Sequence, residues 1–150
     1  MDRRSCSASI AAGHRGTVLT ALLLDTSVLI AVERRKLDLD RLIADDDEPA
    51  IAAITAAELG VGVELATGRR KLNRQAFVED LLEVLPVIAY DLEVARAHTT
   101  LLVAARRAGR PRGAHDLIIA ATALATARTV VTADLTGFDD LPGVVVRAPG

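Results

Sequence analysis

The sequence predicts an α/β fold in which a central five-stranded parallel sheet is covered by helices on both faces. Short apolar runs alternate along the chain with longer segments that carry a helical pattern, over short connections. The first apolar run, Leu19–Leu24, is continuous, as expected for a strand that is buried on both faces. No repeat or linker divides the 150 residues, and this length suits a single domain.

The individual elements follow from the apolar runs and from the residues that end them. Strands are expected at residues 19–24, 49–54, 84–89, 129–132 and 144–146, and Pro86 suggests that the third strand lies at an edge. Helices are expected at residues 28–32, 38–44, 55–67, 72–82, 92–108 and 116–126. Asp91 is expected to cap the long helix, while Gly68 and Gly109 are expected to end the helices that precede them.

Composition and charge narrow the class of protein. Hydrophobic residues make up 51% of the chain and charged residues 25%, which is typical of a globular domain. The net charge of −2 provides no overall attraction to nucleic acid. Cys6 is the single cysteine, so no internal disulfide is possible, which suits a reducing cytoplasm. The run Ala21–Leu24 is too short for a membrane span. Residues 1–18 are interpreted as a flexible extension of a domain at residues 19–150.

Acidic residues follow three of the expected strands, at the end where a parallel sheet binds its ligands. Asp25 comes directly after the first strand, Glu58 lies in the first turn of the helix after the second, and Asp134 follows the fourth. Ligands of open parallel sheets bind beyond the carboxyl ends of the strands, at the switch point. Asp116 opens the helix that leads into the fourth strand, so it reaches this edge only if the loop at residues 109–115 carries the helix start there.

Carboxylates that gather at one edge need protons or cations to offset their repulsion. Two like charges 4 Å apart repel by roughly 4 kcal/mol at the effective dielectric constant of a protein surface. Mg²⁺ or Mn²⁺, which prefer oxygen ligands, are the natural partners of such a group. One or two such ions can activate a water molecule and stabilise the charge that builds on a phosphoryl group.

Each acid also has an ordinary structural interpretation. Asp25 could cap the helix that follows it, and Glu58 completes a capping-box pattern that begins at Thr55. Asp116 could be a helix-start residue stabilised by the helix dipole, and Asp134 could be a turn residue. The joint arrangement of the four acids favours a functional site over these separate explanations.

Four segments of the chain form a pattern in a fixed order: Leu23–Ile30, Ile54–Leu59, His115–Ala121 and Val130–Asp134, the last followed by Phe138. Together they resemble the PIN-domain family and, within it, the VapC toxins of VapBC toxin–antitoxin pairs. Each motif alone is weak, but all four on matching elements are specific, and the resemblance spans about residues 19–147.

The resemblance implies a PIN-like three-layer fold and an endoribonuclease that depends on Mg²⁺ or Mn²⁺ and cuts tRNA, rRNA or mRNA. It also implies a cognate VapB-type antitoxin that silences the enzyme by occupying its active-site groove. A homodimer or a toxin–antitoxin hetero-oligomer would be the assembled form, without a membrane association.

The site residues of the family transfer onto this chain by position. The four acids correspond to Asp25, Glu58, Asp116 and Asp134, which are expected to be both the catalytic and the metal-binding set. Asp25 and Asp116 are expected to be the primary metal ligands, and the other two would complete the shell directly or through water. The hydroxyl groups expected to position the substrate or metal-bound water are those of Thr26, Ser27 and Thr132.

Two clusters of arginines could flank the acidic site. Their candidate contacts to RNA phosphates are Arg69 and Arg70 in one cluster and Arg110 and Arg112 in the other. The alternative is that these clusters are solvated helix ends favoured by the helix dipole. His115 is expected to be a loop histidine, with a role as general base left open.

Two other functions compete with a nuclease. Asp25 after the first strand is also compatible with a phosphatase or phosphotransfer domain, but haloacid-dehalogenase-like phosphatases need a second Asp where this chain has Ser27. A receiver domain would need a Lys near the fifth strand, where the basic residue is Arg147. The second rival is a binding module that has kept the fold without activity, and the presence of all four acids argues against it.

Overall fold

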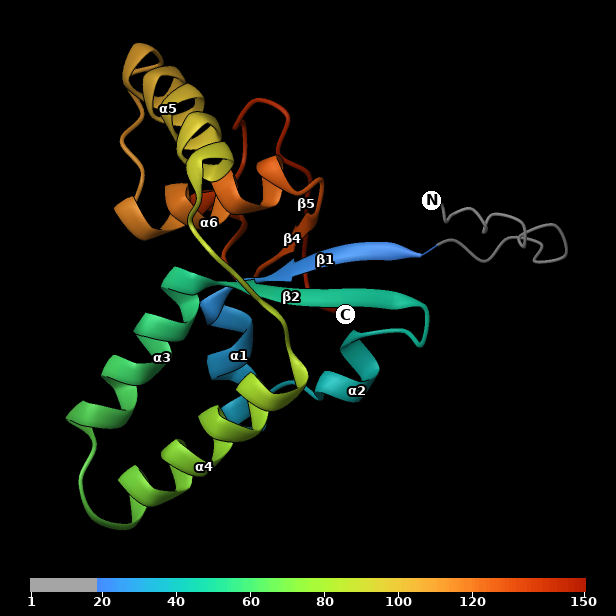
Figure 1. Ribbon diagram of the computed structural model, residues 1–150, viewed down its shortest axis with the longest axis vertical. Helices are drawn as coiled ribbons and strands as arrows, with labels where there is room; N and C mark the ends of the chain where they lie inside the picture. The colour runs from blue at the N-terminus through green and yellow to red at the C-terminus, as the bar shows by residue number, and fades with distance from the viewer. Residues whose placement is uncertain (1–18) are drawn as a thin grey trace, which may run out of the picture.

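A five-stranded, all-parallel sheet forms the centre of the computed structural model, which describes residues 19–150 (Figure 1). The strand order is β3-β2-β1-β4-β5. The strands are β1 (Thr20–Leu24), β2 (Asp47–Ala52), β3 (Val87–Ile88), β4 (Thr129–Val131) and β5 (Val146–Arg147). The predicted fold class is therefore confirmed, while the extension expected at residues 1–18 lies outside the described residues.

Helices cover both faces of the sheet (Figure 1). One face carries α1 (Thr26–Glu33), α2 (Leu39–Leu42), α3 (Ala53–Leu65) and α4 (Gly68–Val84), and the other carries α5 (Leu92–Arg107) and α6 (Ala114–Ala125). A short 3-10 helix, η2 (Leu135–Gly137), follows β4. None of the helices in residues 19–150 is long and apolar enough to cross a membrane.

The central strand β1 supplies side chains to two separate cores. Leu23 packs with the residues of α5 and α6, whereas Leu22 and Leu24 pack with those of α1, α3 and α4. All three leucines are fully buried. Because successive side chains of a strand point to opposite faces, a strand with both faces covered is apolar without alternation. The continuous apolar run in the sequence is explained by this arrangement.

The capping box predicted at Thr55–Glu58 is wrong. Helix α3 begins at Ala53, directly after β2, and its N-cap residue Ala52 makes no side-chain hydrogen bond. Thr55 is fully buried inside the helix, and Glu58 faces residues of α1 and α6 instead of the helix start. The close connection between strand and helix leaves no room for the predicted cap and places Glu58 near the carboxyl end of the sheet.

The helix signals at Asp91 and Gly109 agree with the structure, whereas the helix end predicted at Gly68 is wrong. Asp91 caps α5 by accepting a hydrogen bond from the Val94 N–H at 3.0 Å. Gly109 ends α5 with a φ of +66°, a left-handed conformation that glycine adopts without steric cost. Gly68 also has a positive φ, but it begins α4, because α3 already ends at Leu65. The strand β3 lies at the edge of the sheet, as Pro86 predicted, but it is shorter than expected because α4 continues to Val84.

Candidate active site

The carboxylate of Asp25 lies at the end of β1, at the point where the chain order of the strands reverses. The Asp25 N–H donates to the Val131 carbonyl of β4 at 2.9 Å, which fixes the backbone in register. Its Oδ2 accepts hydrogen bonds from Ser27 Oγ at 2.6 Å and from Thr132 Oγ1 at 2.9 Å. Both hydroxyls bind the same oxygen, so Oδ1 carries neither bond. The side chain does not cap α1, so that ordinary interpretation is wrong.

Glu58 projects from α3 and is held by two other helices. Thr26 Oγ1, at the start of α1, donates to Glu58 Oε1 at 2.6 Å and also lies 3.2 Å from Thr55 Oγ1. His115 Nδ1, on α6, lies 2.9 Å from Glu58 Oε2. Both carboxylate oxygens are therefore oriented by partners from other elements. The expectation that His115 is a plain loop residue is wrong, since it lies in the first turn of α6 and contacts an acid of the site.

The loop before α6 brings Asp116 to the same edge of the sheet. A Cβ placed on Gly137, in η2 after β4, would lie 2.7 Å from Asp116 Oδ2 and 3.6 Å from Asp134 Oδ2. Both carboxylates therefore lie close to the point that a side chain at residue 137 would occupy. Asp116 therefore lies near Asp134. The loop at residues 109–115 carries the start of α6 to the edge of the sheet where Asp134 lies.

The pKa of the Asp116 carboxyl shows that all four acids share one electrostatic environment. Burial raises this pKa above its ordinary value, and the negative charges of Asp25, Asp134 and Glu58 raise it further. The nearby His115 opposes these effects. Burial and like charges both disfavour the ionised form of a carboxylic acid. The direction of the shift therefore places Asp116 within reach of the negative charges of the other three acids.

Thr132 connects Asp25 to the loop that carries Asp134. Its hydroxyl accepts from the Asp134 N–H at 2.9 Å while donating to Asp25 Oδ2. The Ala133 N–H donates to Ser27 Oγ at 3.1 Å. Thr136 Oγ1 donates to Asp134 Oδ1 at 2.7 Å. The hydroxyls that the sequence assigned to positioning therefore hold the carboxylates, and their action on substrate stays a prediction.

Arg110 and Arg112 are engaged with the loop after η2. Arg110 forms ion pairs with Asp139 at 3.3 Å and Asp140 at 2.8 Å. The side chain of Arg112 is only 6% exposed and donates to the carbonyl of Asp139 at 2.6 Å. A guanidinium buried in this way supports the loop and is poorly placed to contact phosphate. Arg69 and Arg70, in contrast, are exposed at the start of α4.

The side chains of the site are not drawn together as a finished metal cluster. Among residues 19–150, no group of three or more His, Cys, Asp or Glu side chains is arranged to hold a metal ion as it stands. The donor set nevertheless suits a divalent cation, because it consists of carboxylate oxygens whose mutual repulsion a cation would offset. Binding would require the acids to move closer together.

Gly137 is a part of the site that the sequence did not reveal, because an isolated glycine after a strand has many explanations. We expect Gly137→Ala to lower the rate of RNA cleavage at least about tenfold without unfolding the protein, because the new methyl group would displace the Asp116 carboxylate. Gly60→Ala in α3 is the control, since nothing lies within 4 Å of its Cβ. It should keep full activity and gain up to about 1 kcal/mol of stability. Equal activity of both variants would contradict the proposed contact.

The raised pKa of Asp116 predicts how stability depends on pH in metal-free buffer. Because the folded state retains this proton at higher pH than the unfolded state, the free energy of unfolding falls as pH rises through the interval between the two pKa values. This loss of stability is complete at pH values above the pKa of Asp116 in the folded state. It vanishes at pH values below the ordinary pKa of aspartate. Asp116→Asn should therefore be more stable than the parent at pH 7, with a difference that shrinks in acid. Urea unfolding of both proteins from about pH 3 to 7 in EDTA measures their free energies of unfolding. A difference between the two proteins that does not change with pH would contradict the raised pKa of Asp116.

Comparison with known proteins agrees with this geometry. Residues 22–144 match the family described as PIN domain. The Ribonuclease VapC5 of Mycobacterium tuberculosis is 40% identical over 122 residues, which cover 79% of this chain and 86% of that protein. The crystal structure of VapBC-5 from the same organism has a chain with a TM-score of 0.72 and 30% identity, covering 86% of this chain and 98% of that one. A chain of the DNA-bound VapBC from Salmonella typhimurium has a TM-score of 0.75 and 27% identity, covering 87% and 98%.

A parallel sheet with acids at its switch point and a match over most of the chain define one class of protein. The chain belongs to the PIN domain family, in the group of the VapC ribonucleases. This assignment leaves no support for the receiver and phosphatase alternatives.

Proposed function

We propose that this chain is a divalent-metal-dependent endoribonuclease and the toxin of a type II toxin–antitoxin pair, acting on tRNA, rRNA or mRNA in the cytoplasm. The proposal rests on one observation. In a chain of the VapC group, the charges of three acids from separate parts of the sequence raise the pKa of a fourth, Asp116. The names of related proteins support an RNA substrate, since one is the tRNA(fMet)-specific endonuclease VapC of Salmonella typhimurium, 29% identical over 127 residues.

We propose the following roles for the residues of the site. Asp25 and Asp116 would be the primary ligands of Mg²⁺ or Mn²⁺, and Glu58 and Asp134 would complete the shell directly or through water. The bound ion would supply activation of water and stabilisation of charge on the phosphoryl group. The hydroxyls of Ser27 and Thr132 keep Asp25 Oδ2 fixed.

Glu58 is placed differently from the other acids and would have a different task. One of its oxygens is bound by Thr26, and the other lies against His115 on the exposed side of the site. A carboxylate held in this way can orient a water molecule through hydrogen bonds. His115 would act as a positioning residue for Glu58, because the contact runs through the carboxylate.

The partner would be an antitoxin of the VapB type encoded with this chain. Solved structures with the same fold include the VapBC complexes from Mycobacterium tuberculosis and Salmonella typhimurium. By analogy, the chain would form a homodimer or a hetero-oligomer with its antitoxin, which would cover the acidic edge and block access of RNA.

Expression of the chain with and without the product of the neighbouring gene tests this function. We expect growth to stop when the chain is expressed alone and new RNA 5′ ends to appear at discrete positions. Co-expression of the partner or the substitution Asp25→Asn should prevent both effects. A chain that fails to bind Mn²⁺ and creates no new 5′ ends would instead be a binding module with the fold of a nuclease.

A further inference from the structure

A groove of about 960 Å³ lies between the end of α1 and the first half of α4, and the function proposed above does not account for it. Five arginines and one glutamate provide all of its charged side chains: Glu33, Arg34, Arg35, Arg69, Arg70 and Arg74. The whole chain has a net charge of −2, so this positive groove departs from the average of the molecule. Such local concentration of charge attracts polyanions.

Only one of the five arginines is occupied by an internal partner within the described residues. Arg74 Nε forms an ion pair with Glu33 at 2.9 Å, and its Nη1 donates to the Gly62 carbonyl at 3.1 Å. The other four arginines are exposed, and none of residues 19–150 forms an ion pair with them. Arg74 and Glu33 thus pair with each other inside the groove, and the remaining guanidinium groups are exposed on its surface.

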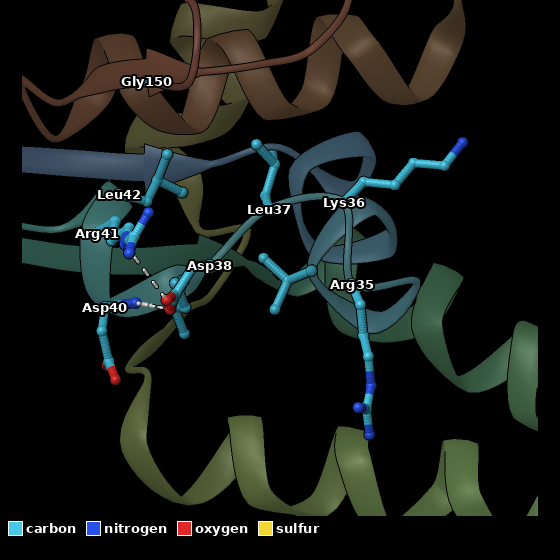
Figure 2. Close-up of a pocket in the computed structure, with 10 residues that line it drawn as sticks. Arg35, Lys36, Leu37, Asp38, Asp40, Arg41, Leu42 and Gly150 are labelled. Atoms are coloured by element: carbon cyan, nitrogen blue, oxygen red, sulfur yellow. Dashed lines mark hydrogen bonds and ion pairs between the residues drawn. The ribbon is translucent and has the colours of Figure 1, made fainter.

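Arg35 occupies a backbone position that favours glycine. It follows the end of α1 with a φ of +60°, where a side chain is sterically disfavoured. Figure 2 shows its side chain extending toward α4, while the neighbouring Lys36 points away from that helix. The backbone at this position therefore favours glycine, whereas the side chain present adds a guanidinium group to the groove.

The groove leads to the acidic edge of the sheet. A smaller hollow of about 90 Å³ shares Glu33, Arg34, Arg74 and Phe77 with the groove and is also lined by Glu58. The groove therefore adjoins a hollow that Glu58, one of the four acids, helps to line. The floor offers one half-buried aromatic ring, Phe77, so charge and not base stacking would dominate the contact.

We propose that the arginine groove formed by Arg34, Arg35, Arg69 and Arg70 binds the phosphate backbone of single-stranded RNA beside the cleavage site. The assignment rests on the proposed function, and it names the surface that holds the flanking nucleotides of the substrate. RNA is favoured over an acidic protein segment because the groove combines four available guanidinium groups with little apolar lining.

The test measures binding of a fluorescent single-stranded RNA to the full chain in EDTA, where metal-dependent cleavage is blocked, over a range of salt concentrations. The groove variant is Arg35→Gly, Arg69→Gln and Arg70→Gln. The control is Arg96→Gln and Arg107→Gln, which removes exposed charges from α5 on the other face of the sheet. The Tm of the groove variant should equal that of the parent, because glycine suits the backbone at residue 35 and the other two substitutions lie at exposed side chains, and an unchanged Tm shows that a loss of binding does not come from unfolding.

We expect the groove variant to bind RNA at least about tenfold more weakly and its salt slope to fall by about 2, since each lost phosphate contact removes roughly 0.7. The control should keep both values within experimental error. Unchanged affinity and slope in the groove variant would overturn the proposal. The proposal would also be overturned if the groove variant bound RNA normally but lost affinity for poly-glutamate. The groove would then serve an acidic protein segment.

Failure of this inference can be distinguished from failure of the proposed function. If the parent protein cuts RNA with Mn²⁺ while the groove variant binds RNA normally, the groove assignment is wrong and the nuclease stands. If the parent protein cuts nothing but the groove variant loses RNA binding, the groove assignment stands and the nuclease is wrong.

Discussion

Replacement of either Asp25 or Asp116 by asparagine is expected to abolish RNA cleavage, with a loss of at least about 10³-fold in rate. Asn keeps the shape of the side chain but removes the charge that a divalent cation needs. The fold should persist in both variants. The hydroxyls of Ser27 and Thr132 can still contact an amide at residue 25, and Asp116→Asn removes a charge that burial and the neighbouring acids disfavour. A gel assay with a defined RNA and Mn²⁺, combined with circular dichroism, measures both properties.

The matched control for this prediction is Asp80→Asn. Asp80 is an exposed acid on α4 and lies outside the group that shifts the pKa of Asp116. The Asp80→Asn variant should cut RNA at the rate of the parent protein. If both site variants also retained the parental rate, the assignment of these acids to metal binding would be wrong.

Phe138→Ala is expected to destabilise the protein by about 3–5 kcal/mol, the usual cost of removing a large buried aromatic side chain. Phe138 is 1% exposed and packs in the core on the α5–α6 face of the sheet. It directly follows Gly137, so it anchors the segment that faces Asp116 and Asp134. Since a domain has only about 5–15 kcal/mol of net stability, a large share would be lost.

Urea unfolding measures this effect, and Leu135→Ala serves as the comparison. Leu135 begins the same short helix but is 45% exposed, so its truncation should cost less than about 1 kcal/mol. Activity of Phe138→Ala should also fall at temperatures where the protein is still folded, because the loop would lose its anchor. Equal stability of the two variants would show that Phe138 does not hold this segment.

Features that depend on one stretch of sequence were predictable in this chain. The continuous apolar run of β1, the cap at Asp91 and the helix end at Gly109 all follow from local chemistry, and the structure confirms them. The position of Asp25 and Asp134 at the carboxyl edge follows from the topology of a parallel sheet, in which every strand ends at the same edge.

Features that depend on contacts between distant segments were not predictable. The capping-box pattern at Glu58 is chemically sound, but the direct connection of β2 to α3 leaves the helix start at Ala53. The burial of Arg112 depends on contacts with Asp139, 27 residues further along the chain. The closeness of Gly137 to Asp116 arises from packing between two loops and leaves no trace in either segment alone.

The central claim is that acids from four separate elements form one site for a divalent cation. Calorimetric titration of the purified chain with Mn²⁺ tests this claim most directly. We expect saturable binding by the parent protein and by Asp80→Asn, and no measurable binding at the same concentrations by Asp25→Asn or Asp116→Asn. Identical Mn²⁺ binding by all four proteins would contradict the claim.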